Sequence, residues 1–289
     1  LVTGALGFIG SHVVEALLGD GQEVLGVDDL STGSWANAIP GAKYEEVSIL
    51  HPKLKDIASK FSPDYIFHLA AQPLVRLSYE IPSETFEVNV IGTANVLDGV
   101  RLLQKKCSVV LITTDKVYHN NEWTYPYREN DRLGGYDPYS ASKACAELLI
   151  DSYRNSFFNI NNYDKHFKGI AVARAGNVIG GGDFAENRII PDLIRGVITG
   201  IPVEIRNAES TRPWQHVLDP LSGYISALEA ILNDEKITSI NFGPDTKSIA
   251  VSEVVEVAVK TWGFSTSIEL GSSVQNNMAE AVSLDLNPD

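Results

Sequence analysis

The sequence predicts an α/β fold in which a mainly parallel sheet is covered by helices on both faces and carries a smaller C-terminal lobe. Short apolar runs alternate with helix-like segments through the first two thirds of the chain. A glycine-rich turn separates the first apolar run from the first of these segments. The chain has 289 residues, of which 44% are hydrophobic, and this length suits one large domain with a smaller lobe. These observations together indicate a Rossmann-type, doubly wound sheet.

The elements are expected in a strand–helix order that leads to parallel pairing. The apolar runs predict strands at residues 23–27, 64–69, 109–113 and 169–173. The amphipathic segments predict helices at residues 10–19, 84–103, 140–155, 191–199 and 220–232. Because each strand is followed by a helix, we expect βαβ units whose strands lie parallel and are buried on both faces.

The charge and cysteine content exclude several classes of protein. The net charge of −14 opposes general binding to nucleic acid or to a membrane surface. The two cysteines, Cys107 and Cys145, cannot form a disulfide framework, and no Cys/His spacing indicates a metal site. With no apolar run of roughly 18 residues and no recognisable signal peptide, we expect a soluble, cytoplasmic protein. Met278 is the single methionine and Leu1 lies just before the glycine turn, so we expect a longer protein trimmed at both ends.

The glycine turn indicates a dinucleotide site. Gly4, Gly7 and Gly10 are three residues apart, and such a turn lets the backbone approach a pyrophosphate held at a helix N-terminus. Asp28 ends the next predicted strand, eighteen residues after Gly10, where a carboxylate can accept both ribose hydroxyls. Because this carboxylate would repel a 2′-phosphate, NAD is favoured over NADP. A packing turn with a solvated Asp28 is the alternative.

A tyrosine and a lysine four residues apart predict redox chemistry on an alcohol. Tyr139 and Lys143 follow Pro138, which favours a helix start, so both side chains should lie on one helix face. We expect the ammonium to lower the pKa of the tyrosine, which could then take the proton of an alcohol as hydride leaves for nicotinamide. Residues 113–116 (Thr-Thr-Asp-Lys) end a predicted parallel strand, where ligands bind in such sheets. A chance helix pair and a local ion pair are the alternatives.

Beyond these features, several motifs resemble the extended short-chain dehydrogenase/reductases. The motifs are Gly4-x-x-Gly7-x-x-Gly10, Leu69-Ala70-Ala71, Asn89-Val90-x-Gly92-Thr93 and Tyr139-x-x-x-Lys143. Within this family, the stretches at residues 70–76, 113–116, 129–139, 173–183 and 212–217 look like those of the nucleotide-sugar 4,6-dehydratases that act on CDP-glucose. The resemblance covers nearly the whole chain. Residues 28–33, in contrast, look like the sugar-epimerase branch, and Ile9 and His12 replace a lysine and a tryptophan that are usual in the CDP-glucose enzymes.

The resemblance implies a redox-neutral dehydration of a nucleotide sugar with NAD as the bound cofactor. The sugar would be oxidised at C4, would lose water from C5 and C6, and would receive the hydride back at C6. The implied catalytic residues are Thr114, Asp115, Lys116, Tyr139 and Lys143. The implied cofactor-binding residues are Gly4, Gly7, Phe8, Ile9, Gly10, Asp28, Leu69, Ala70, Ala71, Asn89, Thr113, Tyr139 and Lys143. The implied substrate-binding residues are Gln72, Arg76, Asn177, Arg188 and Arg212.

Domain organisation and partners are expected on the same basis. Residues 1–176 would form the NAD-binding Rossmann domain, and residues 177–289 mainly a substrate-binding lobe, with a segment near 217–243 packing back on the first domain. The partners expected are a nucleotide-sugar substrate and a second copy of the chain in a homodimer or higher oligomer. Three alternatives stay open: a 4,6-dehydratase or a 4-epimerase for another nucleotide sugar (UDP-, dTDP- or GDP-linked), and a non-catalytic NAD-binding sensor.

Overall fold

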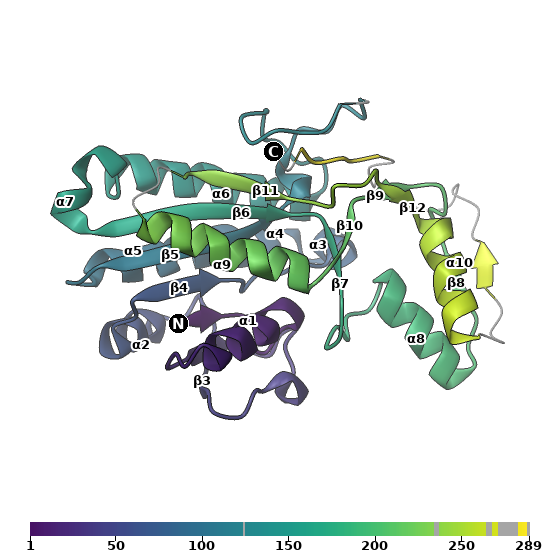
Figure 1. The fold of residues 1–289 in the computed structure, drawn as a ribbon, viewed down its shortest axis with the longest axis horizontal. Helices are drawn as coiled ribbons and strands as arrows, with labels where there is room; N and C mark the ends of the chain where they lie inside the picture. The colour runs from purple at the N-terminus through teal and green to yellow at the C-terminus, as the bar shows by residue number, and fades with distance from the viewer. Residues whose placement is uncertain (124, 234–236, 264–267, 271–282, 288–289) are drawn as a thin grey trace.

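The predicted α/β fold is confirmed in the computed structural model, which describes residues 1–123, 125–233, 237–263, 268–270 and 283–287. Met278 and parts of the predicted C-terminal lobe lie outside these ranges. A seven-stranded parallel sheet runs through the molecule (Figure 1). Its strands are β1 (Val2–Thr3), β2 (Leu25–Asp28), β3 (Lys43–Glu46), β4 (Tyr65–His68), β5 (Cys107–Thr114), β6 (Lys168–Ala175) and β11 (Ser239–Phe242).

The strand order places a crevice next to the glycine turn. The order is β11-β6-β5-β4-β1-β2-β3, so the chain proceeds outward from β1 to β3 and then returns to β4 on the other side of β1. Val2 and Thr3 pair with Gly26 and Val27 on one side and with Phe67 and His68 on the other. In open α/β sheets, ligands bind at the carboxyl ends of the strands where the order reverses.

Helices cover both faces of the sheet, as the sequence predicts. The helices are α1 (Phe8–Gly19), α2 (Lys53–Phe61), α3 (Val75–Glu80), α4 (Pro82–Phe86), α5 (Thr93–Leu102), α6 (Pro138–Ser156), α7 (Tyr163–His166), α8 (Ile189–Thr199), α9 (Leu218–Leu232) and α10 (Val251–Trp262). Helices α1 and α9 pack on one face through a core that includes Val13 and Leu228. Helices α2, α5 and α6 cover the other face, with Leu97 and Ile150 in a second core.

The predicted helix at residues 84–103 is present but is interrupted by a wide turn. Between α4 and α5, Glu87–Gly92 form a π-helical turn in which Asn89 is buried. Such turns often mark functional positions because they re-aim side chains out of the regular helical register. Here the turn brings Asn89 within hydrogen-bond reach of Gln72 and Ser142.

The smaller lobe lies beyond the carboxyl ends of the sheet strands (Figure 1). Helices α8 and α10 and strand β8 (Val203–Ile205) share a small core that includes Leu193 and Val255. The remaining short strands are β7 (Asn177–Ile179) paired with β10 (Trp214–His216), β9 (Thr211–Arg212) paired with β12 (Ile249–Ala250), and β13 (Ile268–Leu270) paired with β8. Between the two parts of this lobe the chain returns to the sheet: α9 packs on β5 and β6, and β11 pairs with β6. The domain boundary at residue 176 stays a prediction.

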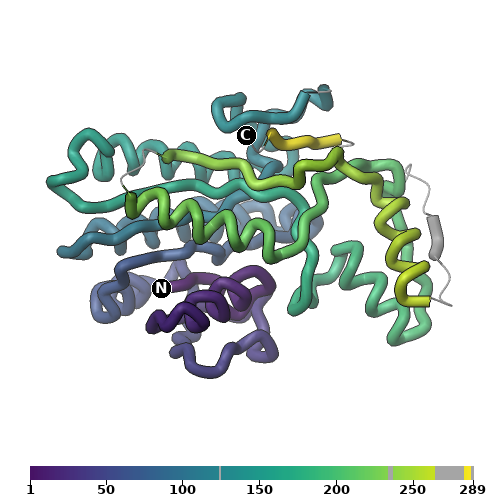
Figure 2. The backbone as a smooth tube through the Cα atoms, in the orientation of Figure 1, coloured from purple at the N-terminus to yellow at the C-terminus, as the bar shows by residue number. Residues whose placement is uncertain are grey.

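Two segments far apart in the sequence lie side by side at the edge of the sheet near β11 (Figure 2). The Tyr127 amide donates to the Asp285 carbonyl at 2.9 Å, and the Asn287 amide donates to the Tyr127 carbonyl at 2.9 Å. Tyr118, Tyr127, Leu284 and Leu286 form a core of their own with their neighbours. Among the helices described, none is long and apolar enough to cross a membrane.

Candidate active site

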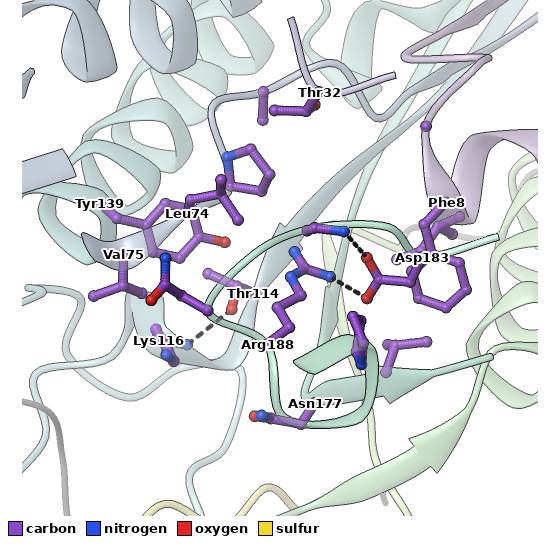
Figure 3. Close-up of a pocket in the computed structure, with 18 of the residues that line it drawn as sticks. Phe8, Thr32, Leu74, Val75, Thr114, Lys116, Tyr139, Asn177, Asp183 and Arg188 are labelled. Atoms are coloured by element: carbon purple, nitrogen blue, oxygen red, sulfur yellow. Dashed lines mark hydrogen bonds and ion pairs between the residues drawn. The ribbon is translucent and has the colours of Figure 1, made fainter. Parts of the chain in front are cut away.

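A cavity of about 890 Å³ opens at the carboxyl ends of the strands, between the sheet and the smaller lobe (Figure 3). Its wall contains the glycine turn, the ends of β2, β4 and β5, the start of α6 and residues of the lobe. All but two of the predicted site residues line it. The predicted residues that line the cavity are Gly4, Gly7, Phe8, Ile9, Gly10, Asp28, Leu69, Ala70, Ala71, Arg76, Thr113, Thr114, Asp115, Lys116, Tyr139, Lys143, Asn177, Arg188 and Arg212.

The glycine turn brings main chain against main chain at two positions. Gly4 has a φ of +71°, and a Cβ on it would lie 2.7 Å from the Ala70 amide nitrogen. A Cβ on Gly10 would lie 1.9 Å from the Gly4 carbonyl oxygen. Helix α1 therefore starts close against the end of β1, with Gly7 as its N-cap and no side-chain cap on its first amides. Those free N–H groups and the helix dipole make this end of the cavity suitable for a pyrophosphate.

The carboxylate of Asp28 is fixed at the end of β2. Its Oδ2 accepts a hydrogen bond from the Leu6 amide and its Oδ1 accepts one from the Leu30 amide, each at 2.9 Å. Burial raises the pKa of Asp28, and these backbone donors oppose the rise. With the Gly7 amide as a third backbone donor, the carboxylate keeps a lone pair for one further donor. The residues present at this edge of the cavity therefore fit a dinucleotide with free ribose hydroxyls.

A buried histidine links the strands beneath the crevice. The Thr93 hydroxyl donates to the Asn89 carbonyl at 2.7 Å, so it accepts from His68 Nε2 at 3.0 Å. His68 Nδ1 is then the acceptor for the Thr3 hydroxyl at 2.7 Å. Burial, with the nearby charge of Lys143, lowers the pKa of His68 to about 3. This neutral ring therefore connects β1, β4 and α5 directly below the predicted cofactor site.

Helix α6 presents Tyr139 and Lys143 to the cavity, as their spacing predicts. Asp137 caps the helix by accepting from the Ser140 amide at 2.9 Å, and Pro138 occupies its first turn. The Tyr139 amide donates to the Ser78 hydroxyl at 3.1 Å, which ties α6 to α3. Lys143 Nζ donates to the Ile112 carbonyl at 3.1 Å.

The expected lowering of the tyrosine pKa by the lysine is not found. Burial raises the pKa of Tyr139 to about 12, and a hydrogen bond with Thr114 only partly opposes this rise. Burial also lowers the pKa of Lys143 to about 8, since Lys143 is 8% exposed. The physical reason is that both groups lie in a poorly solvated wall, which disfavours the charged form of each.

The segment after β5 provides an acid. Asp115 is 1% exposed, its Oδ1 accepts from the Thr114 hydroxyl at 2.9 Å, and its Oδ2 has no hydrogen-bond partner in the described structure. Burial raises the pKa of Asp115, whereas the charge of Lys116 lowers it. The Lys116 amide donates to the Thr114 hydroxyl at 3.3 Å (Figure 3). A carboxyl group in this environment is suited to keep and then donate a proton.

Arginines from three segments surround the other end of the cavity. Arg188 pairs with Asp183 at 3.3 Å, as Figure 3 shows, and the Arg212 guanidinium donates to the Thr211 carbonyl at 2.8 Å. Arg76 and Arg206 both donate to the side-chain oxygen of Asn187, at 3.3 and 3.1 Å. These cations supply locally the positive charge that an anionic ligand needs in an acidic protein.

Asp183, Asn187 and Arg206 line the cavity but were missed from the sequence. They belong to the loops around α8, where no periodic pattern fixes their position. The signal available was the cluster of arginines after residue 187 in an otherwise acidic chain.

The two predicted site residues outside the cavity wall are Gln72 and Asn89. The side chain of Asn89 accepts from the Gln72 amide at 2.8 Å and donates to the Ser142 hydroxyl at 2.8 Å. The side chain of Gln72 accepts from the Leu74 amide at 2.6 Å and donates to the Thr85 hydroxyl at 2.9 Å. Both side-chain amides thus satisfy buried groups of the protein, and their predicted contacts with cofactor and substrate stay predictions. The two side chains hold the β4 exit loop and α6 in place.

Comparison with known proteins shows the family. A family model described as "NAD dependent epimerase/dehydratase family" matches residues 1–243. A CDP-glucose 4,6-dehydratase of Salmonella typhimurium is 48% identical over 236 residues, which cover 81% of this chain and 66% of that protein. A UDP-glucose 4-epimerase of Mycolicibacterium smegmatis is 38% identical over 162 residues, which cover 54% of this chain and 51% of that protein. The chain thus spans less than two thirds of the length of these relatives.

Solved structures agree with this assignment. The UDP-glucose 4-epimerase of Thermus thermophilus in complex with NAD has a TM-score of 0.85 at 26% identity, covering 99% of this chain and 89% of that one. A dTDP-glucose 4,6-dehydratase of Streptomyces venezuelae shares the fold, with a TM-score of 0.83 at 23% identity, covering 99% of this chain and 87% of that one. With the glycine turn, the Tyr139–Lys143 pair and the family match in agreement, this chain belongs to the NAD-dependent epimerase/dehydratase family, and NAD is its cofactor.

Proposed function

We propose that this protein dehydrates a nucleotide sugar, converting CDP-glucose to CDP-4-keto-6-deoxyglucose. The observation that carries the proposal is Asp115, a buried acid with one unpartnered oxygen, in the same cavity as Tyr139 and Lys143. A 4-epimerase needs only the tyrosine–lysine pair, whereas elimination of water needs an additional acid for the leaving hydroxyl. The family match and the similarity to a CDP-glucose 4,6-dehydratase support the same reaction.

The first step is removal of the proton from the C4 hydroxyl of the sugar. Tyr139 is the base, and its hydrogen bond with Thr114 places the phenol next to the substrate-facing end of β5. Burial keeps the phenol protonated in the free protein, so this proposal requires that the phenolate forms when NAD and substrate are bound. The ammonium of Lys143, one helical turn away on α6, would stabilise that phenolate. Bound NAD would accept hydride from C4 and later return it at C6, so the overall reaction is redox-neutral.

The second step is loss of water from C5 and C6. Asp115, whose pKa is raised by burial, gives a proton to the departing C6 hydroxyl. Lys116 takes up the C5 proton, which the 4-ketone has made acidic, and a proton returns from Lys116 to C5 when hydride is added at C6. The Thr114 hydroxyl donates to the Asp115 carboxylate and accepts from the main-chain amide of Lys116, and these bonds fix the turn that carries the three residues.

The cavity wall divides between cofactor and substrate in this proposal. The glycine turn, Asp28, residues 69–71 and Thr113 would hold the dinucleotide. Arg76, Asn177, Arg188 and Arg212 would hold the sugar nucleotide, the arginines by hydrogen bonds to the diphosphate. Gln72 and Asn89 would act through the protein by positioning the β4 exit loop and α6.

The second candidate function is 4-epimerisation of a UDP-linked sugar. It is favoured by the 38% identity to a UDP-glucose 4-epimerase and by the fold shared with the Thermus thermophilus enzyme. The two candidates differ at C5 and C6, which an epimerase leaves unchanged. A non-catalytic sensor would leave C4 unchanged as well.

The test is to incubate the full-length protein with NAD and CDP-glucose in deuterated water and to follow the sugar by NMR. A 4-keto-6-deoxy product carrying deuterium at C5 is expected. Asp115→Asn should still oxidise C4 but should form product about 10²–10⁴-fold more slowly. Lys116→Ala should abolish C5 exchange and spare C4 oxidation, and persistent C5 exchange would refute its role.

The substrates of the rival functions serve as controls in the same assay. Inversion at C4 of a UDP-sugar, with C6 intact, would establish the epimerase instead. Turnover of a dTDP- or GDP-sugar to a 4-keto-6-deoxy product would keep the reaction and change the nucleotide. Absence of turnover with all four, despite tight binding of NAD, would favour the sensor.

Association into a homodimer stays a prediction. Large apolar side chains are exposed on two helices of the same sheet face, Leu102 on α5 and Leu148 on α6. We expect light scattering of the full-length protein to give a dimer mass, and a monomer mass would refute this expectation.

A further inference from the structure

Helix α6 carries a buried acid that the proposed chemistry does not use. Glu147 follows Lys143 by one helical turn, and its side chain is 4% exposed. It forms an ion pair with Arg174 of β6, whose Nε donates to both carboxylate oxygens at 3.0 Å and whose Nη2 donates to Oε2 at 2.5 Å. Glu147 Oε1 also accepts from the Thr113 hydroxyl at 2.6 Å.

These contacts fix α6 against the end of β5 at two consecutive residues. Lys143 donates to the Ile112 carbonyl, and Glu147 accepts from the side chain of Thr113. Because Thr113 and Thr114 adjoin, the same contacts set the distance between the catalytic helix and the hydroxyl that bonds Tyr139.

The network continues from Arg174 to the far edge of the sheet. Arg174 Nη1 donates to the Tyr118 hydroxyl at 2.7 Å, and Tyr118 donates to Asn241 Oδ1 of β11 at 2.6 Å. Asn241 Nδ2 donates to the Tyr127 carbonyl at 3.0 Å. Glu147 and Arg174 thus belong to a chain of satisfied polar groups, and both are held rigidly.

The charges around Lys143 single out Glu147 as its source of electrostatic support. The ionisable groups on the elements packed around Lys143 include Tyr139 and Glu147 on α6, His68 on β4, Asp115 and Lys116 after β5, and Arg174 on β6. Burial keeps Tyr139 and His68 uncharged at neutral pH and raises the pKa of Asp115. The charge of Glu147 raises the pKa of Lys143 against the larger lowering by burial.

We propose that Glu147 is a positioning residue for Lys143: it anchors α6 to β5 one helical turn from Lys143, and its buried negative charge supports the positive charge of that lysine. Arg174 and Thr113 orient the carboxylate for this role by donating four hydrogen bonds to it from neighbouring strands. The inference rests on the proposed role of Lys143, but its test measures the charge of Lys143 directly and is independent of any turnover.

The experiment follows the Cε signals of 13C-labelled lysines by NMR as pH is varied, in the full-length protein. The signal of Lys143 is assigned by its absence from Lys143→Met. Glu147→Gln should lower the titration midpoint of Lys143 by about one to two pH units, because it removes a nearby buried negative charge. Arg174→Gln should raise the midpoint, since it leaves that charge uncompensated.

The opposite directions separate electrostatic support from a purely structural role. Both single variants break the same ion pair, so a structural role predicts the same change in both. The double variant Glu147→Gln/Arg174→Gln, which leaves neither charge unpaired, should again lower the midpoint. Tyr118→Phe is the matched control: it cuts the network beyond Arg174 and should leave the midpoint within about 0.3 units of wild type.

Two outcomes would overturn the proposal. One is an unchanged Lys143 midpoint in the folded Glu147→Gln or double variant. The other is loss of the folded state in all three variants, which would show that the pair serves folding and not Lys143. If the Lys143 midpoint shifts as expected in the variants but the wild-type protein turns over no nucleotide sugar, this inference would be upheld and the proposed function refuted.

Discussion

Acidification should destabilise this protein through one histidine beneath the predicted cofactor site. His68 is 4% exposed and hydrogen-bonded on both nitrogens, to the hydroxyls of Thr3 and Thr93. Since Thr93 uses its hydrogen for the Asn89 carbonyl, a second proton on His68 would find the Thr3 hydroxyl already turned toward Nδ1. Protonation must therefore break this network and bury a charge.

The size of the effect follows from the pKa of His68. It lies at about 3 in the folded protein, against 6.5 for an ordinary histidine. Between these two values the unfolded chain binds a proton that the folded chain does not bind, so the free energy of unfolding falls as pH falls below 6.5. The loss from His68 alone should be about 3 kcal/mol at pH 4.5 and about 4 kcal/mol at pH 3, where half of the folded molecules also bind the proton.

Urea unfolding at pH 7 and pH 4.5, for wild type and His68→Gln, isolates this contribution. The variant should be less stable at pH 7 but should lose about 3 kcal/mol less than wild type on acidification. His216→Gln, at an exposed histidine, is the control and should keep the wild-type pH dependence. If the His68 ring signal titrated near pH 6.5 in an NMR experiment on the folded protein, the reasoning would be refuted.

Three further predictions concern the cavity. Gly10→Ala places a methyl group 1.9 Å from the Gly4 carbonyl oxygen. Thermal unfolding should therefore show a loss of stability of about 1–3 kcal/mol, and calorimetry should show weaker binding of NAD. Wild-type affinity for NAD would contradict the close approach of the two segments. Asp28→Asn should lower the affinity for NAD about 10- to 100-fold and reduce the ratio of NAD affinity to NADP affinity in direct binding measurements. An unchanged ratio would show that Asp28 does not contact the ribose. Tyr139→Phe should slow oxidation at C4 about 10²–10⁴-fold while NAD affinity stays within about twofold, and a wild-type rate of NADH formation would exclude it as the base.

Local patterns were sufficient to predict the sheet core and one wall of the cavity. These patterns depend on residues that are close in the sequence. The glycines are three residues apart, Asp28 follows Gly10 by eighteen residues, and Tyr139 and Lys143 are four residues apart. Such short-range geometry is carried by the backbone itself. The structure brings all of these residues to the same cavity.

Features that depend on distant partners could not be predicted. Asn89 belongs to a motif, but only the π-helical turn and the position of the β4 exit loop show that its side chain bonds Gln72. The strand Lys43–Glu46 was missed because its residues are partly or fully exposed at the sheet edge and lack an apolar run. The expected effect of Lys143 on Tyr139 failed because burial of both groups cannot be read from their spacing.

The late position of β11 in the chain has a consequence for biosynthesis. The outer edge of β6 and the face that α9 covers stay unprotected until residues 218–242 have left the ribosome. At roughly 5–20 residues per second, β11 follows β6 by on the order of 3–13 seconds. During that interval the nascent chain presents a bare strand edge and an apolar face, both of which favour aggregation. Chaperone capture of the nascent chain should therefore concentrate between the synthesis of β6 and that of β11.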